Sequence, residues 1–111
     1  MPNYSNLKQD LEEVSDFLLA LGNENRQAII IRLLEENSCT GIQIDKLTAA
    51  TNLSRPAISH HLKVLKDAKI VDYHKNGTKN FYYLKHDVSE ITKLQDFLTK
   101  VTKIMTKEQK Q

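Results

Sequence analysis

Apolar residues recur at steps of three and four positions along most of this chain, the spacing that gathers them on one face of a helix. The first such stretch runs from Ser5, a favourable capping residue, to Leu21 before Gly22. A second begins after Asn23–Asn25 and ends near Asn37. Three further helices are predicted over residues 44–50, 54–68 and 87–106. The pattern therefore predicts a mainly helical protein.

Two short runs of strand-favouring residues, Ile70–His74 and Phe81–Leu84, lie before the last predicted helix. Asn76-Gly77 between them predicts a hairpin, because both residue types accept positive φ. The polar turn at residues 51–53 joins two short helices, which is typical of a helix-turn-helix over residues 44–68. The expected order α-α-α-α-β-β-α, with about five helices and a β-hairpin wing over residues 70–84, is that of a winged helix-turn-helix.

The first and last predicted helices carry apolar stripes that suit pairing between two copies of the chain. In the last helix the stripe steps by 3, 4, 3 and 4 residues, which resembles a heptad seam. We expect residues 1–21 and 87–106 to form a dimer interface across a two-fold axis. A terminal helix of this kind can instead fold back on its own domain, and the sequence leaves that alternative open. The predicted seam consists of Leu7, Leu11, Val14, Ile91, Leu94, Leu98, Val101 and Met105.

Length and composition suit one globular domain over residues 1–111. The chain has 111 residues, 40% of them hydrophobic and 27% charged. Its net charge of +2 hides a segregation of charge along the sequence, since residues 1–50 carry 4 basic and 8 acidic side chains, whereas residues 51–111 carry 12 and 6. A basic half predicts contact with a polyanion, with a merely solvated basic surface as the alternative.

The predicted fourth helix has the composition of a recognition helix. Ile58, Leu62 and Leu65 would face inward, so that small and hydrogen-bonding side chains look outward toward base edges. Two lysines flank the thin hairpin tip, which can reach a DNA backbone. The candidate DNA-binding residues are Ser54, Arg55, Pro56, Ala57, Ser59, His60 and Lys63 on the helix and Lys75, Asn76, Gly77 and Lys79 on the wing.

Several other functions find no support in the sequence. No apolar run approaches the roughly 20 residues that span a bilayer, and no secretory signal is readable. The single cysteine, Cys39, cannot form an intramolecular disulfide, so we expect a cytoplasmic protein.

No catalytic constellation or phosphate-binding loop is present, which predicts a protein that is not an enzyme and has no cofactor. We interpret His61 as a structural histidine and Cys39 as an ordinary thiol.

Three segments carry a resemblance to a known family. Leu21–Arg26 followed by an apolar helix, Leu53–Leu65, and Lys69–Val71 continuing through Gly77 to Leu84 resemble the entry, recognition-helix and wing motifs of the ArsR/SmtB regulators. The resemblance covers about Leu18 to Leu84. It implies a dimeric, operator-binding repressor whose first and last helices form the dimer interface. Lys69 departs from the pattern, which often has glycine there, so we expect a strained turn.

The resemblance also allows the positions of the family's metal sites to be compared with this sequence. Two sites are best known in the family, and the positions of the first hold Gln43 and Asp45 here instead of a cysteine pair. Frames for the second site begin at His86 or Asp87 and supply too few ligands to close a tetrahedral zinc site. We therefore predict no metal site. The inducing signal stays open: it is a metal at a site shared between subunits, a small molecule, an oxidant at Cys39, or none.

The predicted function is sequence-specific binding of double-stranded DNA at an inverted-repeat operator by a homodimeric transcriptional regulator, most simply a repressor. The alternative is a winged helix used for protein interaction, or an accessory factor without specific DNA binding. The concentration of hydrogen-bond donors on the fourth helix and wing favours DNA.

Overall fold

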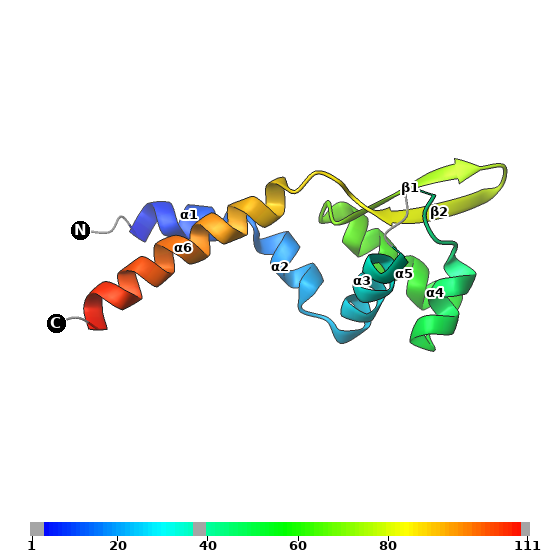
Figure 1. The fold of residues 1–111 in the computed structure, drawn as a ribbon, viewed down its shortest axis with the longest axis horizontal. Coiled ribbons are helices and arrows are strands. Elements are labelled where there is room, and N and C mark those ends of the chain that lie inside the picture. Colours follow the sequence, from blue (N-terminus) through cyan, green and yellow to red (C-terminus); the bar gives the residue numbers. More distant parts are fainter. Residues whose placement is uncertain (1–3, 37–39, 110–111) are drawn as a thin grey trace. The chain divides into compact units, whose positions relative to one another are not determined.

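The computed structural model describes residues 4–36 and 40–109, with side chains described as far as Lys107. Its element order is that of a winged helix-turn-helix, six helices and one antiparallel hairpin in the described residues (Figure 1). The elements are α1 (Tyr4–Glu13), α2 (Ser15–Leu21), α3 (Glu24–Glu36), α4 (Ile44–Thr51), α5 (Arg55–Asp67), β1 (Val71–Asn76), β2 (Lys79–Leu84) and α6 (Ser89–Gln109).

The chain divides into two compact units. The first comprises Met1–Asp16 with Asp87–Gln111, and the second is Phe17–His86. The predicted helix-turn-helix and wing both fall in the second unit, and the predicted dimer helices fall mostly in the first. The organisation of the whole chain as one domain stays a prediction.

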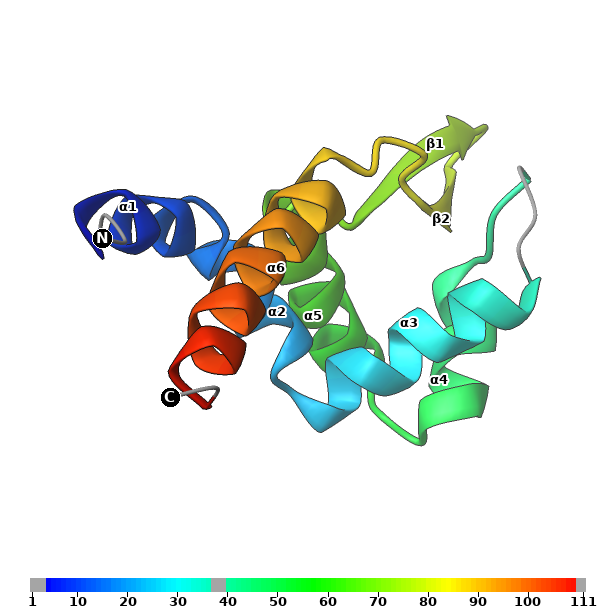
Figure 2. The same cartoon turned by 60° about the vertical axis from the view of Figure 1, so that its left-hand side comes forward.

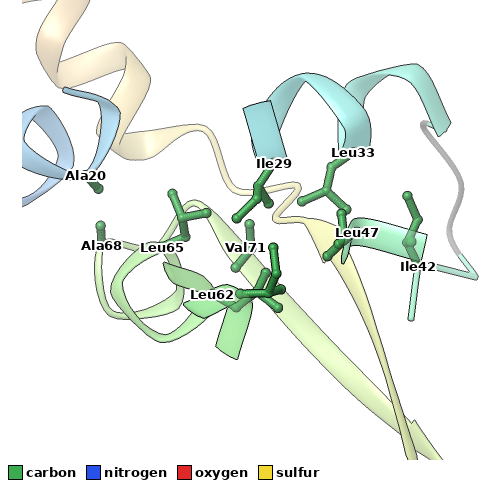
Figure 3. Close-up of a cluster of buried hydrophobic side chains, with 10 residues drawn as sticks. Ala20, Ile29, Leu33, Ile42, Leu47, Leu62, Leu65, Ala68 and Val71 are labelled. Atoms are coloured by element: carbon green, nitrogen blue, oxygen red, sulfur yellow. The ribbon is translucent and has the colours of Figure 1, made fainter. Parts of the chain in front are cut away.

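Figure 2 shows the elements of the second unit, and an apolar core is built from α2, α3, α4, α5 and β1 (Figure 3). Ile58, Leu62 and Leu65 of α5 are at most 1% exposed, which confirms the inward face that the sequence predicts for this helix. Ile29 and Leu47 meet them from α3 and α4. Each fully buried side chain of this size contributes roughly 1.5–3 kcal/mol relative to an exposed one, so these contacts set the position of α5.

Local chemistry explains where α5 begins and ends. The Ser54 hydroxyl accepts a hydrogen bond from the Ala57 N–H at 3.3 Å, and Pro56 stands in the first turn, where a proline costs no hydrogen bond. Asn52, with φ of 60°, turns the chain sharply between α4 and α5. After α5, Lys69 adopts φ of 65°, a left-handed conformation that favours glycine. The strained turn expected at this lysine is therefore present.

The hairpin is longer, and its loop tighter, than the sequence suggested. The strands span six residues each, and Asn76 pairs with Lys79, which leaves only Gly77 and Thr78 in the loop. Asn76-Gly77 was expected to form the turn, but Gly77 alone supplies the positive φ, 67°, so Asn76 stays in the strand ladder. The strands are held to the loop before α4 by Ile42, whose N–H donates to the Tyr82 carbonyl at 2.7 Å.

The first unit consists of α1 and α6, which contact one another. The helix expected over residues 5–21 is interrupted at Val14, where the N–H bonds back to Leu11 O at 3.2 Å, a three-residue step in place of the helical four. The Ser15 hydroxyl also donates to Leu11 O, at 3.0 Å. Two helices therefore replace the single one predicted. Among the described helices, none has the length and apolar character that a membrane span requires.

Asp87 and Glu90 were expected to form a capping box at the start of the last helix. The Asp87 carboxylate accepts the Ser89 N–H at 3.0 Å, a bond two residues ahead, whereas the capping half of that motif bonds the residue three ahead. The Glu90 carboxylate lies 3.5 Å from Lys93 Nζ, one turn further into α6. Asp87 therefore caps the start of this helix through a shorter turn than the expected one, and α6 begins at Ser89.

Candidate nucleic-acid interface

The outward face of α5 presents most of the side chains that the sequence assigned to DNA. Arg55, Ser59, His60 and Lys63 are exposed, because the three-four spacing of the buried residues leaves these positions on the opposite side. Ser54 and Pro56 are exposed at the beginning of the helix, and Ala57 is half-buried. The face is narrow and free of bulky apolar groups, as a helix that enters the DNA major groove requires.

Both cations on this face have acidic neighbours. Arg55 Nη1 forms an ion pair with Asp45 Oδ1, which lies in the first turn of α4. Lys63 Nζ lies 3.5 Å from Asp67 Oδ2, one turn further along α5. All four side chains are more than 60% exposed, so water screens these pairs and each contributes little to stability. Both cations therefore stay accessible from solvent while they are paired.

The tip of the hairpin supplies the second group of predicted residues. Lys75, Asn76, Gly77 and Lys79 are all exposed there, on either side of the two-residue loop. Figure 1 shows this tip projecting past the helices of its own unit. Two lysines on a thin projecting tip can approach a phosphate backbone with little steric conflict.

A polar pocket of about 150 Å³ connects α5 to the wing. It brings together three segments: the start of α4, the first residue of α5 and the turn into β2. Arg55 and Lys79, assigned separately from the sequence, line the same cavity. The lining residues are Gln43, Ile44, Asp45, Arg55, Thr78, Lys79 and Asn80. Helix and wing therefore form one continuous polar surface.

Asp45 and Asn80 are the site residues that the sequence analysis missed as contributors to this surface. Asp45 and Arg55 are ten positions apart in the sequence, and only the helix-turn-helix geometry brings the first turns of α4 and α5 together. Asn80 lies opposite Lys75 in the strand ladder, and its Oδ1 is buried with no hydrogen-bond partner in the part of the chain that the structure describes. The segregation of acidic and basic residues along the sequence gave no indication of this acid within the basic surface.

His61 makes contacts within its own unit, as expected of a structural histidine. His61 is half-buried, and its Nδ1 accepts a hydrogen bond from Arg26 Nη1 at 3.4 Å. Arg26 also donates to the carbonyls of Ala20 and Leu19, at 2.9 and 3.1 Å, so this arginine joins the end of α2 to α5. Burial first, then the Arg26 and His60 charges, lower the pKa of His61. A neutral His61 therefore supports the structure beneath the exposed face.

The residues of the predicted dimer seam lie on α1 and α6, except Val14, which follows α1, and they differ in exposure. Ile91, Leu98 and Met105, spaced seven residues apart, are 44%, 50% and 58% exposed. Leu94 and Val101 are half-buried on the same helix, as is Leu7 on α1. Leu11 is 40% exposed, whereas Val14 is completely buried. Lys100 Nζ donates to Asp10 Oδ2 at 2.8 Å, and this hydrogen bond raises the pKa of Lys100.

The described residues contain no group of three histidine, cysteine, aspartate or glutamate side chains that could hold a metal ion. Of the two positions compared with the family's cysteine pair, Gln43 is half-buried at the start of α4 and Asp45 is paired with Arg55. Cys39 lies outside the described residues.

Comparison with known proteins identifies relatives of this chain. Residues 25–73 match the family described as bacterial regulatory protein, arsR family. An uncharacterized HTH-type transcriptional regulator of Methanocaldococcus jannaschii is 43% identical over 90 residues, which cover 78% of this chain and 96% of that protein. The arsenical resistance operon repressor of Staphylococcus xylosus is 33% identical over 76 residues, 68% of this chain and 69% of the repressor.

Solved structures agree on the fold. An ArsR-like transcriptional regulator from Rhodococcus sp. RHA1 superposes with a TM-score of 0.73 at 22% identity, over 88% of this chain and 84% of that one. The region of matched sequence contains α4, α5, nearly all of α3 and the first three residues of β1, whereas the wing tip and β2 lie beyond it. On this evidence the chain belongs to the ArsR family of regulatory proteins.

Proposed function

We propose that this protein is a sequence-specific, double-stranded-DNA-binding transcriptional regulator, a repressor that acts as a homodimer in the cytoplasm and carries out no catalysis. The observation that carries the proposal is the continuous polar surface formed by α5 and the wing. Exposed Ser59, His60 and Lys63 can face base edges, while the wing tip reaches the backbone beside them. Two of the named relatives, a regulator and an operon repressor, support the same role.

The exposed stripe on α6 supports the homodimer. Ile91, Leu98 and Met105 form a seven-residue repeat of large apolar side chains, the spacing at which two helices pack along a seam. Leu94, Val101, Leu7 and Leu11 extend this surface, and the buried Val14 offers none to a partner. Two-fold symmetry would make the operator an inverted repeat with half-sites about one helical turn apart, or a multiple of it.

Functional roles on the polar surface can be separated by substitution. Binding sites selected from a randomised duplex pool provide the probe, and fluorescence anisotropy provides the affinity. Arg55→Ala and Lys63→Ala should each cost about 1–3 kcal/mol, unevenly across operator variants, if they contact bases. Lys79→Ala should weaken all duplexes to a similar degree, as loss of a phosphate contact does. Equal losses on every duplex from all three variants would contradict the assignment of α5 to base recognition.

We also propose that metals do not regulate this protein through either of the sites best known in the family. Arsenical and cadmium resistance appear in the names of relatives, but Gln43 and Asp45 replace the cysteine pair here. Titration of the protein–operator complex with zinc, cadmium, copper(I) and arsenite, with and without chelator, should leave the anisotropy unchanged. Stoichiometric release of DNA by any of these ions would contradict the proposal.

A further inference from the structure

Asp45 places a negative charge within the surface that is proposed to bind DNA. Its carboxylate pairs with Arg55 Nη1 and so connects the first turn of α4 to the first turn of α5. The Asp45 side chain is 70% exposed. A solvated carboxylate at this place repels phosphates and weakens the affinity of the protein for any duplex. A benefit of Asp45 to DNA binding would therefore lie in sequence discrimination, because the carboxylate lowers the affinity itself.

The pair changes what Arg55 can recognise. A guanidinium carries five N–H donors and binds a phosphate readily through two of them. Asp45 engages Nη1 and limits the directions in which the remaining donors can point. A bidentate contact with a base edge needs a fixed orientation, whereas a phosphate can be met from many directions. Pairing with Asp45 therefore disfavours a phosphate contact by Arg55 and favours a base contact.

The residues around the pair also keep Arg55 beside Asp45. Lys79 lines the same pocket from the wing, so a second cation opposes movement of Arg55 toward the hairpin. Of the described residues that line this pocket, Asp45 alone is acidic. Arg55 therefore has one carboxylate within the pocket with which to pair.

We propose that Asp45 is a positioning residue for DNA sequence specificity, which acts by orienting Arg55 toward a base and away from the phosphate backbone. This inference rests on the proposed function. Because both partners are exposed, the ion pair contributes little to folding. Asp45→Asn should accordingly leave the urea midpoint of unfolding near that of the wild type, and its effect should appear in binding.

The test compares discrimination between duplexes. Dissociation constants are measured for the selected operator, for a scrambled duplex, and for operators altered at the base pair where Arg55→Ala loses most discrimination. Asp45→Asn should bind the scrambled duplex about two- to fivefold more tightly and should lose roughly five- to tenfold of its discrimination at that base pair. In an Arg55→Ala background the same substitution should not alter discrimination. Glu35→Gln, an exposed position on α3, is the control for the change of charge.

The outcomes separate this inference from the function on which it rests. If Asp45→Asn tightens all duplexes equally, the carboxylate acts as a general repulsive charge and the inference is wrong. If discrimination falls to the same extent with and without Arg55, Asp45 does not act through that arginine, and the inference is again wrong. A wild-type protein that prefers no duplex sequence would contradict the proposed function itself, and this inference with it.

Discussion

His61 makes the stability of this protein depend on pH. Its Nδ1 accepts the hydrogen bond from Arg26, which only a neutral imidazole can do. Burial and the neighbouring Arg26 charge place the pKa of His61 below its ordinary value of 6.5. As the pH falls below 6.5, the unfolded chain binds a proton at this residue before the folded protein does, so stability is lost. The contribution is complete above pH 6.5 and disappears as the pH passes through the pKa of the folded state.

Urea unfolding at pH 7.5 and pH 5.5 measures this dependence. The wild type should lose stability between the two values, and His61→Gln should lose less over the same interval, because the residue that takes up the proton has been removed. Ser59→Ala, on the exposed face of the same helix, adds or removes no titratable group and should retain the full wild-type dependence. An unchanged pH dependence in His61→Gln would show that the linkage lies elsewhere.

Residues whose roles depend on local chemistry could be predicted from the sequence. The Ser54 cap needs only the backbone three residues ahead, and the buried face of α5 follows from helical spacing. The pairing of Asp45 with Arg55 could not be predicted, because it depends on the turn at Asn52, whose positive φ determines how closely the two helix starts approach. A distance between residues ten positions apart is a property of the fold and cannot be read from sequence spacing alone.

At the scale of elements, the loop before α4 meets the wing at one crowded point. Gly41, with φ of 82°, precedes Ile42, which exchanges two backbone hydrogen bonds with Tyr82 of β2. A Cβ atom at Gly41 would lie 2.9 Å from the Tyr82 carbonyl oxygen and 3.0 Å from the Phe81 carbonyl carbon. Gly77 at the wing tip has a comparable φ, 67°, but an added Cβ there would meet nothing within 4 Å.

The two glycines therefore form a matched pair for substitution. Gly77→Ala should cost about 1–2 kcal/mol in the free energy of unfolding, the penalty of a left-handed alanine. Gly41→Ala should cost about 1–3 kcal/mol more, because the backbone of β2 must also move. Urea denaturation of both variants measures the difference. Equal costs would mean that the contact between the loop and β2 gives way easily and does not hold the wing in place.

The order and type of the elements could be predicted, but not all of their boundaries. Periodicity identified each helix because amphipathic spacing persists over several turns. The break at Val14 could not be predicted, because apolar spacing continues across it and only the hydrogen bonds to the Leu11 carbonyl mark the interruption. The loop of the hairpin was predicted too long, because polar residues such as Lys75 and Asn80 occupy the strands of an exposed hairpin as readily as a loop.

At the scale of the whole molecule, the proposal requires two copies of the chain. Leu98, in the middle of the exposed stripe on α6, is the position at which a charge should disturb pairing most. Leu98→Asp should yield monomers with weakened operator binding, because dimerisation would otherwise bury an uncompensated carboxylate. Thr99→Asp adds the same charge about 100° around the helix and should still form dimers. Sedimentation that finds the wild type monomeric at micromolar concentration would contradict the dimer.

The central claim is that α5 and the wing bind duplex DNA in a sequence-specific manner, and its most direct test is the salt dependence of binding to a selected operator and to a scrambled duplex. A dimer that neutralises roughly 6–10 phosphates should give a slope of about −5 to −9 for log affinity against log salt concentration. The selected operator should also bind at least about 10³-fold more tightly at physiological salt. A slope near zero, or equal affinity for the two duplexes, would contradict the account.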